Sequence, residues 1–134
     1  LFKHLKTVEW WDSERKKYQL FTSQVTIDEL SSGDYLNKEN ILKLGKEIPI
    51  LFYDEEIERI INIYIKNTLV PIKDIRDGFH LAYASFYEMD YLLTWNCDHL
   101  ANANKVEHIR IIHSRYHLFI PSIITPIELF EGGK

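Results

Sequence analysis

Hydrophobic and polar residues follow two patterns along this chain. One is the spacing typical of amphipathic helices, and the other is the short apolar run typical of buried strands. The helical period predicts helices over residues 2–18, from Val25 to a stop at Gly33, over about 35–46, from Glu55 to about Asn67, from Pro71 to about Met89, and over about 103–117. The short apolar runs predict strands at 20–23, 48–52, 91–94 and 123–124, followed by a turn at 125–129.

Two of the helices have well-defined apolar faces and starting signals. Asp54 is the expected N-cap of the helix that follows it, and Pro71 occupies a first-turn position where its missing N–H costs nothing. The apolar face of the first helix consists of Ile57, Ile60, Ile61 and Tyr64. The expected stripe of the second consists of Ile75, Phe79, Ala82, Phe86 and Met89.

The order of these elements predicts an α/β fold in a single domain over residues 1–134. Strands that alternate with helices favour a three-layer α/β/α sandwich with a short parallel central sheet. The strands are short and mainly apolar, as expected when both faces of a sheet are covered. A doubly wound sheet usually starts with a central strand, whereas this chain starts with a helix. We therefore expect the first strand to be absent from this sequence.

Composition narrows the class of protein. The chain has 134 residues, of which 46% are hydrophobic and 13% aromatic, so it is long and apolar enough for a folded core. The formal net charge is −4, so any nucleic-acid binding depends on a local basic patch, for which Arg15–Lys17, Lys105, Arg110 and Arg115 are candidates. No apolar run approaches the ~20 residues of a membrane span. The single Cys97 cannot form an internal disulfide, which favours a cytoplasmic setting.

Acidic and amide side chains at three places are candidate metal ligands. Glu29 lies near the start of a helix that follows a strand, and Asp77 lies near the start of the helix that begins at Pro71. Asn96 and Asp98 follow the strand expected at 91–94. Such hard oxygen ligands suit Mg²⁺ or Mn²⁺, which can activate water for phosphodiester cleavage.

Each candidate also has a purely structural interpretation. Ser23 and Thr26 both offer N-caps for the helix that contains Glu29. Thr26 to Glu29 matches the S/T-x-x-E capping box, and by itself this interpretation of Glu29 is favoured over metal binding. Asp77 fits an ordinary first-turn acid that interacts with the helix dipole. In the structural interpretation, Asn96 does no more than fix a turn, and Asp98 caps the segment that follows it.

The histidines give weaker signals. His113 and His117 are four residues apart, but the residue after His113 is Ser114, so the H-E-x-x-H zinc motif is absent. We expect both to lie on a solvated helix surface. His80 follows Asp77 by three residues, and could support that carboxylate as a neighbouring hydrogen-bond partner.

Taken together, three motifs resemble the PIN domain, the nuclease fold of VapC-type toxins. They are Thr22-Ser-Gln-Val-Thr-Ile-Asp-Glu-Leu30, Asp77-Gly-Phe-His-Leu-Ala82 and Asp90-Tyr-Leu-Leu-Thr-Trp-Asn-Cys-Asp-His-Leu-Ala-Asn-Ala103. The third is long and specific, and the first two gain weight from their order and spacing. The end of the chain, Ile124-Thr-Pro-Ile-Glu-Leu129, is similar to the terminal segment of one bacterial PIN subgroup.

The resemblance implies a parallel sheet with acids at its C-terminal edge that bind Mg²⁺ or Mn²⁺ and cut RNA. Matched position by position, Glu29, Asp77 and Asn96 would be the metal ligands and catalytic residues. Thr94, Asp98 and His80 would support them or contact the phosphate. The family's first strand, with its leading acid, has no counterpart here. The resemblance also implies a homodimer and a small antitoxin protein that masks the site.

Asn96 is a departure from the many PIN nucleases that carry an aspartate at this point, although the related subgroup often has Trp-Asn. An amide oxygen can coordinate Mg²⁺ but brings no charge. Two alternatives to a ribonuclease therefore stay open. One is a PIN-like module that binds nucleic acid or a partner without catalysis, and the other is a general α/β protein whose acids are helix caps.

Overall fold

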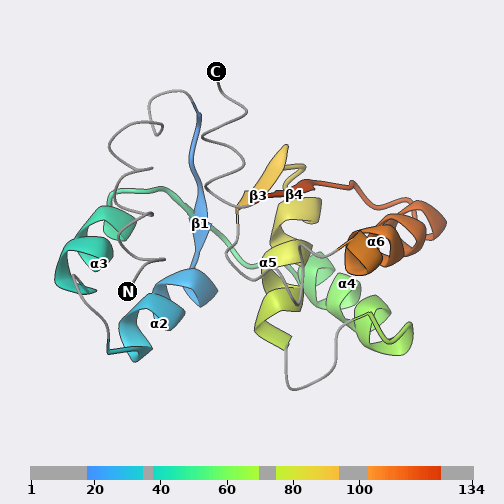
Figure 1. Cartoon of the computed structure of the whole chain (residues 1–134), viewed down its shortest axis with the longest axis horizontal. Coiled ribbons are helices and arrows are strands. Elements are labelled where there is room, and N and C mark those ends of the chain that lie inside the picture. The colour runs from blue at the N-terminus through green and yellow to red at the C-terminus, as the bar shows by residue number, and fades with distance from the viewer. Residues whose placement is uncertain (1–17, 35–37, 70–74, 94–102, 125–134) are drawn as a thin grey trace. The chain divides into compact units, whose positions relative to one another are not determined.

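A computed structural model describes residues 18–34, 38–69, 75–93 and 103–124 (Figure 1). The chain divides into two compact units. The first comprises Leu1–Phe52 with Pro126–Lys134, and the second comprises Tyr53–Thr125. Each unit contains helices and a pair of parallel strands, so the expectation of a mixed α/β chain is confirmed. The helix expected at 2–18 and the turn expected at 125–129 lie outside the described residues.

The first unit joins two short parallel strands through two helices. Its elements are β1 (Thr22–Ser23), α2 (Gln24–Ser32), α3 (Lys38–Lys46) and β2 (Ile50–Leu51). Thr22 pairs with Ile50, and Ser23 pairs with Leu51. Helices α2 and α3 contact each other, with Ile27 and Ile41 buried. Gly45 of α3 is buried at this contact, and a Cβ added there would lie 3.4 Å from Cδ1 of Ile27, at ordinary contact distance.

The second unit has three helices and a second parallel strand pair. Its elements are α4 (Glu55–Lys66), α5 (Ile75–Phe86), β3 (Tyr91–Leu93), α6 (Ala103–Arg115) and β4 (Ser122–Ile124). Strand β3 pairs in register with β4 and is connected to it through α6, which is a β-α-β crossover. Figure 1 shows α4, α5 and α6 as neighbouring ribbons in this unit.

The core of the second unit forms between α4, α5 and α6. As expected, Asp54 caps α4, accepting a hydrogen bond from the backbone N–H of Glu56 at 2.9 Å. The four residues of the expected apolar face of α4 are all buried. Burial on α5 is broader than its expected stripe. Its buried residues are Gly78, Leu81, Ala82, Tyr83, Ala84 and Ser85, whereas Ile75, Phe79 and Phe86 are only half-buried.

All three helices of this unit end with a non-glycine residue in the left-handed region. The residues are Thr68 (φ 53°), Glu88 (φ 52°) and His117 (φ 57°). The next residue in each case donates its N–H to a carbonyl five positions back, as Leu69 does to Tyr64 at 2.9 Å. This is the hydrogen bond that closes the Schellman motif, in which glycine is the usual left-handed residue.

Replacing Thr68 by glycine is expected to stabilise the second unit. A left-handed conformation costs an L-residue roughly 1–2 kcal/mol, and Thr68 is both β-branched and exposed. After allowance for the greater unfolded-state freedom of glycine, Thr68→Gly should raise the free energy of unfolding by about 1 kcal/mol. Urea unfolding of Thr68→Gly beside Thr68→Ala measures this. Equal stability of the two variants would contradict the prediction.

None of the helices in the described part of the chain combines the length and the apolar character that a membrane span requires.

Candidate functional site

Asp77 lies in the first turn of α5, where the positive end of the helix dipole favours an ionised carboxylate. The residues that follow Asp77 suit a helix that packs into the core of its unit. Gly78, directly after Asp77, is buried, and Leu81 and Ala82 follow in the core. Asp77 itself is half-buried.

His80 is one helical turn after Asp77 and is also half-buried. Residues three apart on a helix lie on neighbouring parts of its surface. The spacing is therefore compatible with the supporting role expected for His80, which stays a prediction.

Glu29 lies in the middle of α2, in the first unit, and is half-buried. The N-cap of α2 is Ser23, whose Oγ accepts a hydrogen bond from the N–H of Thr26 at 3.4 Å. Thr26 is therefore inside the helix, and the capping-box interpretation with Thr26 as the N-cap is wrong. The physical reason is that the chain leaves β1 at Ser23 and enters the helix directly.

The remaining candidates follow β3. This strand ends at Leu93, and Thr94, Asn96 and Asp98 lie outside the described residues. Among the residues that are described, no three His, Cys, Asp or Glu side chains form a group that could hold a metal ion.

The connection between α5 and β3 fixes their relative direction. Only residues 87–90 join the two elements, and the helix and strand contact each other. A connection this short between contacting elements reverses the chain. The beginning of α5, with Asp77, therefore lies on the side of the unit toward which β3 runs.

The histidines of α6 differ from the sequence expectation. His113 is fully buried, so its assignment to a solvated surface is wrong. His117 is exposed but lies beyond the end of α6, so the two residues do not share a helix face. The sequence signal for the burial of His113 was its spacing from Ile109 and Ile112, which places His113 on the apolar side of the helix.

The histidine is held by a buried hydrogen-bond chain that sequence reasoning missed. The hydroxyl of Tyr64 lies 2.8 Å from Nε2 of His113, and the two rings stack with centroids 5.5 Å apart. Nδ1 of His113 lies 2.8 Å from the carbonyl oxygen of Phe119, which also accepts a hydrogen bond from Ser85 at 2.7 Å. Burial raises the pKa of Tyr64 well above its ordinary value.

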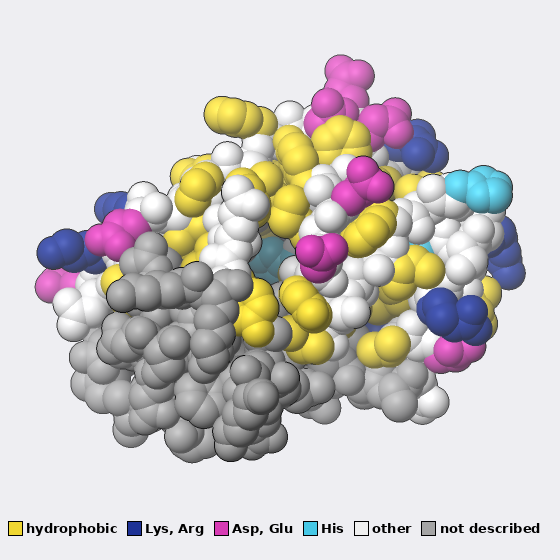
Figure 2. All heavy atoms as spheres, turned by 90° about the horizontal axis from the view of Figure 1, so that it is seen from above, with side chains coloured by type: hydrophobic (Ala, Val, Ile, Leu, Met, Phe, Trp, Pro, Cys, Tyr) yellow, Lys and Arg dark blue, Asp and Glu magenta, His cyan; other side chains and the backbone are white. Residues whose placement is uncertain are grey.

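The basic residues of α6 are largely committed to local contacts. Arg110 forms an ion pair with Glu107 on the same helix, and Lys105 donates to the carbonyl oxygen of Leu69 at 2.7 Å. The hydrogen bond between Arg110 and Glu107 raises the pKa of Arg110 and lowers that of Glu107. In Figure 2, the Lys and Arg side chains of the described residues are scattered on the visible face and do not form a continuous basic surface.

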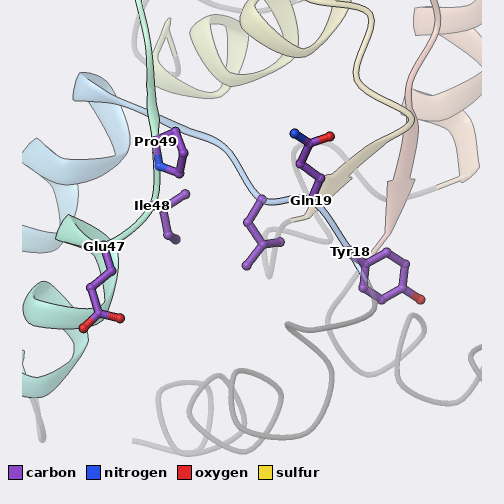
Figure 3. Close-up of a pocket in the computed structure, with 6 residues that line it drawn as sticks. Tyr18, Gln19, Glu47, Ile48 and Pro49 are labelled. Carbon is purple, nitrogen blue, oxygen red and sulfur yellow. The ribbon is translucent and has the colours of Figure 1, made fainter.

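A pocket of about 230 Å³ opens in the first unit (Figure 3), and none of the candidate residues lines it. Its lining comes from the segments that precede β1 and β2, and consists of Tyr18, Gln19, Leu20, Glu47, Ile48 and Pro49. It therefore lies at the starts of two parallel strands. Ligands of open α/β sheets bind at the opposite, carboxyl ends of the strands.

Comparisons of the chain with protein-family models, with curated proteins and with solved structures gave no match.

Proposed function

We propose that this protein is a metal-dependent ribonuclease of the PIN/VapC type, built on a three-layer α/β/α sandwich. The observation that carries the proposal is the sequence from Asp90 to Ala103, in which a short apolar strand is followed by Thr94, Asn96 and Asp98. This motif resembles the PIN family at the point where its site lies.

Two features of the second unit support the proposal. Strand β3 and its parallel partner β4 are connected through α6, which is the crossover connection that the sandwich needs. The reversal between α5 and β3 directs the strand toward the side on which Asp77 lies. Asp77 and the loop after β3 are thus favoured as parts of one site.

The donor chemistry of the candidate ligands fits Mg²⁺ or Mn²⁺. Asp77 and Glu29 carry carboxylates, and Asn96 carries an amide oxygen, all of which are hard ligands. When bound, such an ion activates water and stabilises the charge that develops during phosphodiester cleavage. The two carboxylates would hold the ion, and the amide of Asn96 would complete the ligand set or orient water.

The other residues have supporting roles in the proposal. Thr94 would donate a hydrogen bond to the scissile phosphate, and Asp98 would add the charge that Asn96 lacks. His80 would hold the carboxylate of Asp77 in place. By the same resemblance, a homodimer and a small antitoxin protein are the proposed partners.

The second candidate function is a PIN-like module that binds nucleic acid or a protein without catalysis. Asn96 is the feature that favours it, because an uncharged ligand weakens the binding of a divalent ion.

Metal binding tests the proposal and separates the two functions. Calorimetric titration with Mn²⁺ should show saturable binding that EDTA reverses. In NMR spectra, paramagnetic Mn²⁺ should broaden the backbone amide signals of Glu29, Asp77 and Leu93 before that of His117. Heat no greater than the buffer background would favour the binding module. Broadening centred elsewhere in the chain would contradict the assigned ligands.

A further inference from the structure

His113 is a titratable group enclosed in the core of the second unit. None of its surface is exposed, and both ring nitrogens have hydrogen-bond partners, which are the Tyr64 hydroxyl and the Phe119 carbonyl oxygen. The chain after α6 folds back over the ring, with the N–H of Leu118 donating to the carbonyl oxygen of His113 at 2.8 Å.

The hydrogen bonds fix the protonation state of the ring. A carbonyl oxygen can only accept, so Nδ1 of His113 carries the proton that is donated to Phe119. In the neutral ring Nε2 then accepts, and the hydroxyl of Tyr64 is its donor. The arrangement is fully satisfied only while His113 is uncharged.

Among the described residues, no buried charged side chain compensates for a positive ring. On the helices packed against His113, Asp77 of α5 and Lys105 of α6 are half-buried. The other charged side chains are exposed: Glu55, Glu56, Glu58, Arg59 and Lys66 of α4, Arg76 of α5, Glu88 after α5, and Glu107, Arg110 and Arg115 of α6. The segment 118–124 carries no charged residue. Within the described part of the chain, Tyr64 is the one other titratable group that is hydrogen-bonded to His113. Desolvation lowers the pKa of His113 below its ordinary value, and the hydrogen bond to Phe119 offsets this only in part.

We propose that His113 is an acid-sensitive latch that holds residues 118–124, including β4, against the helices of the second unit. A proton added to Nε2 turns this nitrogen into a donor that faces the Tyr64 hydroxyl. Tyr64 must then accept, and its own proton has no other acceptor among the described residues. A buried donor left unpaired and a buried charge both destabilise the closed state.

The latch opens on the side of Phe119. Tyr64 is fully buried on one side of the ring, whereas Leu118 and Phe119 on the other side are half-buried and Ile120 is exposed. The shortest route of the imidazolium to water is therefore displacement of the segment 118–124. Because β4 pairs with β3, its displacement also exposes the edge of β3.

The direction of the pH effect follows from proton uptake. The closed state keeps His113 neutral, while the open state titrates with an ordinary pKa near 6.5. The open state therefore binds more protons below that pH, and closure weakens as the pH falls. For one group, the equilibrium constant for opening should rise roughly tenfold between pH 7.5 and pH 5.5.

Hydrogen exchange in the intact protein tests the latch. The amides of Leu118 and Ser122, bonded to the carbonyl oxygens of His113 and Asp90, report on the segment. After correction for intrinsic exchange rates, their opening should increase roughly tenfold from pH 7.5 to pH 5.5. The amide of Thr22, bonded to Pro49 in the first unit, should show a smaller change.

Two matched substitutions assign the effect. His113→Asn keeps a donor for Phe119 but cannot titrate, so the tenfold change at Leu118 and Ser122 should disappear. His117→Asn removes an exposed histidine and should leave the change intact. Equal pH dependence in wild type and His113→Asn would overturn the proposal. If His113→Asn does not fold, the wild-type ring signals of His113 decide, because a folded-state titration midpoint near 6.5 would also overturn it.

Discussion

The variant Asp77→Asn is expected to lose Mn²⁺-dependent RNA cleavage, with a rate at least about 100-fold below that of the wild type. The substitution keeps the size of the side chain but removes the charge that the proposed site places at the start of α5. Metal-ion catalysis contributes several kcal/mol to a hydrolytic rate, and each 1.36 kcal/mol corresponds to a factor of about ten. The measurement is the initial rate of cleavage of a labelled RNA at saturating Mn²⁺.

Asp28→Asn is the matched control for this variant. Asp28 is an exposed residue of α2 that accepts a hydrogen bond from Gln24 at 2.9 Å, and it has no role in the proposed site. The Asp28→Asn substitution makes the same chemical change as Asp77→Asn, and the variant should cleave RNA at the wild-type rate. Wild-type activity in a folded Asp77→Asn variant would remove Asp77 from the mechanism.

The second large effect concerns the core of the second unit. Ile57 of α4 is fully buried, and its truncation to alanine removes buried methyl groups and leaves a cavity. Such truncations cost 2–5 kcal/mol, so Ile57→Ala should lower the free energy of unfolding by about 3 kcal/mol.

Ile65 provides a control on the same helix. It is 37% exposed, so Ile65→Ala loses the same atoms from a site that water already reaches and should cost less than about 1 kcal/mol. Urea unfolding of the two variants, followed by circular dichroism, gives the comparison. Similar losses of stability in both would contradict the burial pattern of α4.

The helices were largely predictable because their signals are local. In α4, an N-cap aspartate and an apolar face at helical spacing both act within a few residues, and the structure confirms both. The strands were predicted near their observed positions for a related reason, since a short apolar run is also a local signal.

The errors arose where contacts distant in sequence decide the outcome. Helix α5 is buried across most of its second half, because α4 and β3 both contact it, so a single stripe underestimates its buried surface. His113 has an ordinary polar side chain in sequence, and its burial depends on partners for both ring nitrogens, one of which, Tyr64, is 49 residues earlier. The spacing on α6 pointed to this face, but nothing local identified the partner.

The candidate site was predictable only in part. Sequence placed Asp77 near the start of a helix, and the structure confirms its first-turn position. Glu29 was confirmed as a helical residue, and of the two candidate caps before it, Ser23 is confirmed and Thr26 is wrong. Whether Glu29, Asp77 and Asn96 share one ion depends on the packing of segments far apart in the chain, which no local pattern encodes. Their common role therefore stays a prediction from the family resemblance.

The most direct measurement of the central claim is a time course of wild-type protein with labelled single-stranded and structured RNA, in Mn²⁺ and in EDTA. The proposed ribonuclease should cut RNA in Mn²⁺, stop on addition of EDTA, and resume when excess Mn²⁺ is restored. Intact RNA after incubation with Mn²⁺-loaded, folded protein would contradict the account. So would cleavage that continues unchanged in EDTA, because it would not depend on the metal that Glu29, Asp77 and Asn96 are proposed to hold.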